Sequence, residues 1–214
     1  QVSMPLISLP ERVLCLITAL DPGEDSGSLL ATVRSAVRGG VNMVQVRAPE
    51  LERTAFFNLA AEVMESVGDD AVVIINNRVD VALAVDAGGV QLGERGPAVN
   101  AARRMGGDEW QIGRSVHSVE GAVKAQADQA DFLLLGTLFE TNSHPGQRGD
   151  GLDLVRQVGE TVNLPIIGTG GINLERAREV MAAGAKGVAI SSAILSADDP
   201  EQAAAELKQE IENA

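Results

Sequence analysis

The chain has 214 residues, of which 17 are basic and 30 acidic, giving a formal net charge of −13. This charge repels nucleic-acid phosphates and anionic membrane surfaces, which argues against both as partners. The single cysteine, Cys15, excludes an internal disulfide, and its apolar surroundings predict a buried thiol in a reducing compartment. Since no apolar stretch approaches the roughly 18 residues of a membrane span and the N-terminus lacks a signal-peptide layout, we expect a cytoplasmic location.

Short apolar runs rich in β-branched residues predict eight strands in chain order. They occupy residues 13–18, 43–47, 72–76, 89–93, 111–116, 132–137, 165–168 and 188–192. Segments of helical period follow them at 29–38, 55–67, 79–87, 99–105, 119–127, 152–158, 174–183 and 201–211. Strict alternation of strand and helix is typical of βαβ units and a parallel sheet.

Eight such units favour a closed (β/α)8 TIM barrel over an open doubly wound sheet, which usually carries G-x-G-x-x-G after its first strand. Here the first strand runs into TALDPG at 18–23, without that fingerprint. No linker or change of composition divides the chain, so we expect one α/β domain over 1–214, with 1–10 as an N-terminal extension. The longest irregular stretch is 140–150.

Active sites of such barrels lie at the carboxyl ends of the strands, so the polar residues there are the candidates for a site. They are Gln45, Arg47, Asn76, Asn77, Gln91, Ser115, His117, Thr137, Thr141, Ser143 and His144. Arg47 has two interpretations: binding a substrate carboxylate or forming a structural ion pair. Asn76 and Asn77 likewise either bind a heterocycle or cap the helix that begins near Val79.

Glycines and serines follow the last two predicted strands. The segment GTGGI at 168–172 contributes Gly168, Gly170 and Gly171, and Ser191 and Ser192 can begin a short helix after the eighth strand. Bare backbone amides and a helix N-terminus at this place predict a phosphate site. The alternative is that the glycines only permit tight turns.

Several stretches in order resemble the thiamine phosphate synthase/TenI family over nearly the whole chain. They are VQVR at 44–47, INNRVDVAL at 75–83, GVQLG at 89–93, IGRSVHS at 112–118, GTLFET at 136–141, and the loops at 168–172 and 188–194. The resemblance implies a barrel that binds a phosphorylated thiazole or thiamine phosphate, and it implies a homo-oligomer.

Four positions depart from the synthase branch, which joins a pyrimidine pyrophosphate to a thiazole phosphate with magnesium. Two lysines and two aspartates of that branch correspond to Pro49, His144, Asn77 and Gly96 here. Since magnesium needs hard oxygen ligands, the loss of two carboxylates favours the TenI branch, whose characterised members are thiazole tautomerases. We therefore expect no cofactor, and magnesium only if the synthase alternative holds.

One residue also departs from the tautomerase branch, because Thr137 stands where that branch has its proton-transferring histidine. Threonine is no base near neutral pH, which leaves His117 and His144 as candidate bases. The alternatives are a hydrogen-bonded scaffold role for His117 and a solvated loop position for His144. Three hypotheses follow: a tautomerase, a synthase with a rebuilt pyrophosphate site, or a relative that binds its ligand without turnover.

Overall fold

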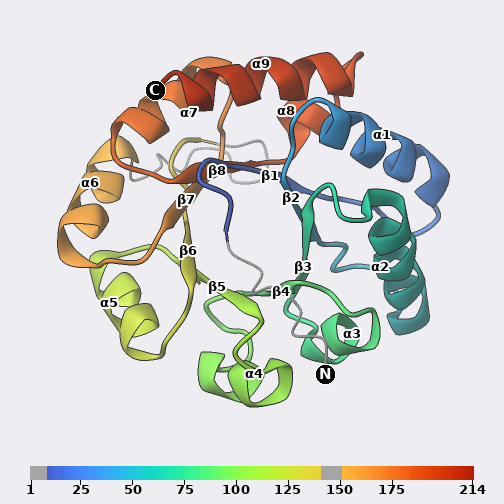
Figure 1. Cartoon of the computed structure of the whole chain (residues 1–214), viewed down its shortest axis with the longest axis horizontal. Coiled ribbons are helices and arrows are strands. Elements are labelled where there is room, and N and C mark those ends of the chain that lie inside the picture. The colour runs from blue at the N-terminus through green and yellow to red at the C-terminus, as the bar shows by residue number, and fades with distance from the viewer. Residues whose placement is uncertain (1–8, 141–150) are drawn as a thin grey trace.

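The computed structural model of the protein describes residues 9–140 and 151–214, and its strands close into one parallel barrel. Each strand pairs with the next in sequence, and β1 also pairs with β8, as Leu16 does with both Val44 and Ile190 (Figure 1). The strands are β1 (Val13–Ile17), β2 (Met43–Val46), β3 (Val72–Asn76), β4 (Gly89–Leu92), β5 (Gln111–Val116), β6 (Phe132–Leu135), β7 (Ile166–Thr169) and β8 (Gly187–Ile190).

A helix follows each strand on the outside of the barrel (Figure 1). The helices are α1 (Ser26–Arg38), α2 (Arg53–Val67), α3 (Val79–Ala84), α4 (Val99–Gly106), α5 (Val119–Ala127), α6 (Gly151–Thr161), α7 (Leu174–Ala182), the short α8 (Ser192–Leu195) and α9 (Pro200–Glu212). The single-domain (β/α)8 barrel predicted from the sequence is confirmed. Two strands end two residues earlier than predicted: β6 stops at Leu135, and β8 gives way to α8 after Ile190.

Alternate residues of the strands build two separate apolar layers. In β1, Leu14 and Leu16 pack outward with the helices, whereas Val13 and Cys15 face a small interior cluster. That cluster also contains Met43, Ile74, Phe132, Leu134, Ile167 and Ala189. Because strand side chains alternate between faces, one row joins the sheet to its helices and the other fills the barrel.

Side-chain caps fix where several helices begin. The Asp25 carboxylate accepts hydrogen bonds from the amides of Gly27 and Ser28 at 3.1 and 3.3 Å. Asn173 caps α7 by accepting from the Arg176 amide at 3.0 Å, and Asp199 caps α9 in the same way. Such caps satisfy amides that have no acceptor within the helix, so each boundary is set by local chemistry.

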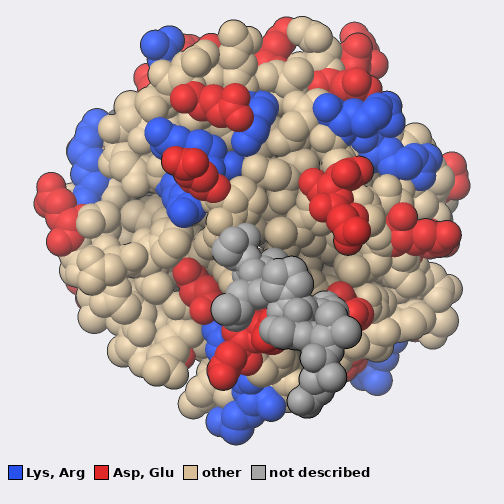
Figure 2. Space-filling model, viewed as in Figure 1, with Lys and Arg blue, Asp and Glu red and all other residues tan. Residues whose placement is uncertain are grey.

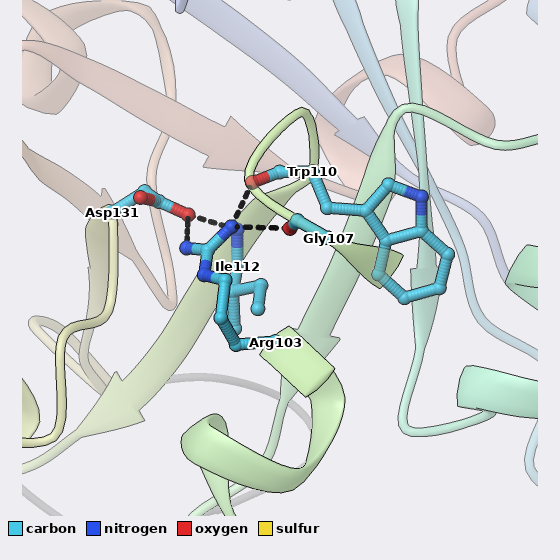
Figure 3. A network of polar contacts seen from close by, with 5 residues as sticks. All are labelled: Arg103, Gly107, Trp110, Ile112 and Asp131. Carbon is cyan, nitrogen blue, oxygen red and sulfur yellow. Dashed lines mark hydrogen bonds and ion pairs between the residues drawn. The ribbon is translucent and has the colours of Figure 1, made fainter. Parts of the chain in front are cut away.

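A polar network joins α4 to the start of β5 and β6 (Figure 3). Arg103 donates to the carbonyls of Gly107 and Trp110 at 3.1 and 2.7 Å and contacts the Asp131 carboxylate at 2.5 Å. The same carboxylate oxygen accepts the Ile112 amide at 2.6 Å. The network lies where β5 and β6 begin, which is the end of the barrel associated with stability.

Charged side chains of both signs lie on the surface. On the face shown in Figure 2, Lys and Arg residues are interspersed with Asp and Glu residues rather than gathered in one broad basic area. Within the described ranges, no helix has both the length and the apolar character that crossing a membrane requires.

Candidate active site at the barrel mouth

Two pairs of neutral polar side chains lie at the carboxyl ends of adjacent strands. Gln45 Nε2 donates to Asn76 Oδ1 at 3.1 Å between β2 and β3, and Gln91 Nε2 donates to Ser115 Oγ at 3.0 Å between β4 and β5. Gln45 and Gln91 are only 4 % and 1 % exposed. Burying an amide is costly unless it is hydrogen-bonded, and here each pair meets part of that need. The structure thus brings together four residues that the sequence predicted for the site.

A buried threonine holds the end of β2 in place. The Thr18 hydroxyl donates to the Arg47 carbonyl at 3.1 Å and accepts from the Arg47 amide at 2.9 Å. Only the backbone of Arg47 is held by Thr18, and the Arg47 side chain is exposed. The ion pairs among the described residues do not include it. Of the two interpretations of Arg47, the structural ion pair is therefore not seen in the described part of the chain.

Asn77 turns the chain after β3 and binds the end of β4. Its backbone is left-handed, with φ of 58°, and its side-chain Oδ1 accepts the Gly93 amide at 2.7 Å. A Cβ atom at Gly96 would lie 2.5 Å from the same Oδ1, so only glycine fits there without a shift. The helix-cap interpretation of Asn76 and Asn77 is wrong, because Arg78 holds the N-cap position of α3 without a side-chain cap.

The chain segments after β6 and β7 run side by side. Leu138 donates to the Thr169 carbonyl at 3.0 Å, and Phe139 donates to the Gly170 carbonyl at 3.1 Å. Gly170 and Gly171 have φ of 93° and 66°, and a Cβ at Gly170 would lie 2.6 Å from the Thr137 methyl group. Both the left-handed backbone and the close approach require glycine at this point.

Gly168 differs from the other two glycines in this loop. A Cβ atom there would lie 2.6 Å from a methyl of Val180 and 2.9 Å from a methyl of Leu138. Both residues are buried, Val180 on α7 and Leu138 in the segment after β6. Packing of β7 against α7 therefore explains Gly168. The glycines whose left-handed backbone shapes the loop are Gly170 and Gly171 instead.

The segment after β8 forms the short helix that the sequence anticipated. Ser191 is at the N-cap position of α8, and its carbonyl accepts from Ile194 and Leu195 at 3.1 and 2.9 Å. The earlier amides of a helix have no acceptor inside it, so those of Ser192 and Ala193 are available. Because β7 and β8 are neighbours, the Gly170–Gly171 and Ser191–Ser192 backbones follow adjacent strands. We call these four residues the phosphate cup, after the phosphate site that the sequence predicts there.

His117 is the histidine of the described mouth. It is exposed after β5, and its ring Nδ1 contacts the carbonyl of Gly136, directly before Thr137. In the tautomer that donates from Nδ1, Nε2 keeps a lone pair. The other predicted loop residues, Thr141, Ser143 and His144, lie outside the described residues.

The family model described as thiamine monophosphate synthase matches residues 14–194. The chain belongs to this TMP-TENI family. Thiamine-phosphate synthases of Natronomonas pharaonis and Pyrococcus furiosus are 37 % and 36 % identical over 189 and 182 residues. These alignments cover 86 % and 85 % of this chain and 88 % and 87 % of the relatives.

Solved structures agree with membership of the thiamine monophosphate synthase family. Thiamine phosphate pyrophosphorylase from Pyrococcus furiosus superposes with a TM-score of 0.83 at 32 % identity, covering 95 % of this chain and 97 % of that one. A 3-hexulose-6-phosphate synthase reaches 0.74 at 19 % identity, covering 92 % and 99 %, which shows a shared fold alone. The named relatives favour the synthase alternative over the TenI placement predicted from the sequence.

The synthase alternative implies Mg²⁺, which prefers carboxylate and other oxygen ligands. Among residues 9–140 and 151–214, no group of three His, Cys, Asp or Glu side chains is placed to hold a metal ion. Near Asn77, the Asp80 carboxylate is bound by Arg78 at 2.8 and 2.7 Å, and these hydrogen bonds lower the pKa of Asp80. The described side chains therefore form no three-ligand Mg²⁺ site of their own, and a Mg²⁺ ion held by one or two carboxylates together with substrate phosphates needs none.

Sequence reasoning missed Arg176 and Phe139. Arg176 Nη1 donates to the Gly171 carbonyl at 2.6 Å, and its guanidinium carbon lies 4.7 Å from the centroid of the Phe139 ring. The two residues are far apart in sequence, and only the pairing of the β6 and β7 loops brings them together. No local pattern in the sequence signals this contact.

Proposed function

We propose that the protein joins a phosphorylated thiazole to a pyrimidine pyrophosphate, as a thiamine-phosphate synthase. The observation that carries this proposal is the 36–37 % identity to synthases of that name over most of both chains. The expected cytoplasmic location suits such a reaction on small phosphorylated molecules, and it remains a prediction, as does the homo-oligomer.

Each part of the mouth has a task in this reaction. The phosphate cup binds the thiazole phosphate through backbone amides, because amides that lack an internal acceptor suit an anion. The Gln45–Asn76 and Gln91–Ser115 pairs offer amide and hydroxyl groups to a heterocycle. Arg47 meets the pyrophosphate, because the planar fork of a guanidinium can donate to two phosphate oxygens at once.

The chemistry follows from the bond that is made. The thiazole nitrogen attacks the carbon that carries the pyrophosphate, the carbon–oxygen bond breaks, and the leaving pyrophosphate keeps the electron pair. Negative charge grows on that leaving group, so a cation such as Arg47 stabilises the transition state more than the ground state. We assign these roles to the protein's own side chains and route no step through a metal ion.

The test is to incubate the protein with both substrates, with added Mg²⁺ or with a chelator, and to quantify thiamine phosphate and pyrophosphate. We expect both products in equal amounts. Arg47→Gln should lower kcat/KM by about 10- to 100-fold, since one charge-stabilising group is lost. Arg104→Gln, which removes an exposed arginine from the outer helix α4, should leave it unchanged. Absence of both products from the folded wild type would overturn the proposal.

A second candidate is the thiazole tautomerase predicted from the sequence. It is favoured by Asn77 and Gly96, which stand where the synthase branch has aspartates, and by His117 beside the Gly136–Thr137 peptide. Its assay is metal-free conversion of the thiazole tautomer carboxylate phosphate. Turnover that His117→Gln abolishes would establish this candidate, whereas ligand binding without turnover in either assay would indicate the third, non-catalytic hypothesis.

A further inference from the structure

We propose that Arg176 is a positioning residue of the phosphate cup, which clamps the Gly170–Gly171 loop to the segment after β6. This inference rests on the proposed function, since it requires that the cup binds a phosphate. The half-buried Arg176 side chain reaches from the first turn of α7 to both loops.

Three contacts close a ring around the glycines. Phe139 donates its amide to the Gly170 carbonyl at 3.1 Å. Arg176 donates to the Gly171 carbonyl at 2.6 Å and places its guanidinium 4.7 Å from the Phe139 ring centroid. A cation over an aromatic face is attractive, and a charged donor strengthens the bond to the carbonyl. Arg176 thus holds the two loops together from one position.

This clamp sets the direction of two amides. In a trans peptide the N–H points opposite to the preceding C=O. With the Gly170 carbonyl turned to Phe139 and the Gly171 carbonyl turned to Arg176, the amides of Gly171 and Ile172 are directed to the opposite side of the loop. Within the described ranges, neither of these amides donates to a protein acceptor. Successive amides with left-handed glycines form an anion-binding concavity.

The charge of Arg176 adds to this arrangement. A cation at the N-terminus of a helix is unfavourable, because that end already carries partial positive charge. No ion pair within the described part of the chain includes Arg176, whereas Arg178 on the same helix lies 3.9 Å from the Glu210 carboxylate. An anion in the cup would offset the charge of Arg176 and of the helix end together.

The experiment compares Arg176→Met with Arg178→Met, which removes the same charge two residues further along α7. Calorimetry would measure the affinities of the folded protein for thiamine phosphate and for thiamine, which lacks the phosphate. The wild type should prefer thiamine phosphate. Arg176→Met should lower the affinity for thiamine phosphate about tenfold and leave the affinity for thiamine unchanged. Arg178→Met should change neither affinity. Arg176→Lys, which keeps a donor but loses the planar stacking, should fall between wild type and Arg176→Met.

The outcomes separate this inference from the proposed function. A wild type with equal affinity for the two ligands would refute the phosphate cup itself. A wild type that prefers thiamine phosphate, with the same preference in Arg176→Met, would overturn the role of Arg176 alone. If Arg176→Met does not fold, Arg176→Lys and Phe139→Leu decide: a reduced preference in both supports the clamp, and an unchanged preference in either contradicts it.

Discussion

At the scale of single residues, Asn77 combines a left-handed backbone with a bond to the next strand. Asn77→Ala loses the acceptor for the Gly93 amide and places an alanine at φ of 58°. Each loss costs about 1 kcal/mol or slightly more, so the free energy of unfolding should fall by about 2–3 kcal/mol. Asn77→Asp keeps the acceptor and tolerates the conformation, and should remain within about 0.5 kcal/mol of wild type.

Urea unfolding curves of these variants, with Asn77→Gly as a third, measure the two effects separately. Glycine removes the backbone penalty but not the hydrogen-bond loss, so Asn77→Gly should fall between alanine and wild type. An Asn77→Ala protein as stable as wild type would show that the Asn77–Gly93 bond contributes nothing.

How far the sequence predicts the site differs between residues. Gln45 and Ser115 could be named because strand ends and alternation of faces are local properties. Asn76 and Gln91 could be named for the same reason, but the pairing of Gln45 with Asn76 and of Gln91 with Ser115 could not, because these bonds depend on strand register and rotamers. For Asn77 the sequence left ligand binding and helix capping open, since an asparagine before a helix is a common cap and nothing local reveals that its side chain turns toward β4.

At the scale of elements, the network of Arg103 and Asp131 fastens α4 to the start of β5 and β6 (Figure 3). Asp131→Ala would leave the Ile112 amide and the Arg103 guanidinium without their shared acceptor. Because Arg103 and Asp131 are only 20 % and 32 % exposed, we expect a loss of about 1–3 kcal/mol in the free energy of unfolding.

The control for this prediction is Asp128→Ala, which breaks an exposed ion pair with Lys124 on α5 and should cost no more than about 0.5 kcal/mol. Thermal and urea unfolding would compare the two variants. The kcat of folded Asp131→Ala should equal that of wild type, because the network lies at the opposite end of the barrel from the mouth. Equal stability losses in both variants would contradict the structural role given to this network.

The same scale shows why the elements were predictable and their ends less so. Eight strands and their helices follow from periodicity, which each segment carries in its own sequence. The end of β8 does not follow from periodicity, since Ser191 and Ser192 could continue the strand as readily as they begin a helix. In the structure the backbone enters α8 at Ser192. No residue within 188–192 indicates from its own sequence whether the strand continues or the helix begins.

At the scale of the whole molecule, the closed barrel leaves no free strand edge through which solvent can enter its interior cluster. Cys15 belongs to that cluster and is 2 % exposed. Burial raises the pKa of its thiol to about 12, with a smaller opposing effect from a backbone hydrogen bond at Gln45. Since the thiolate is the reactive form, the native thiol is both shielded and protonated at pH 8.

We therefore expect Cys15 to react with a disulfide reagent only when the barrel opens as a whole. The paired strands on both sides of β1 would have to separate before reagent could reach the sulfur. At low reagent concentration, the labelling rate divided by that of the unfolded chain gives the equilibrium constant of opening, and hence the free energy of opening. This free energy should match the free energy of unfolding from urea curves within about 0.5 kcal/mol, and it should fall with urea at the same slope. Labelling that is faster and independent of urea would instead show that β1 separates from β2 or β8 by a local motion, and that the barrel does not unfold as one unit.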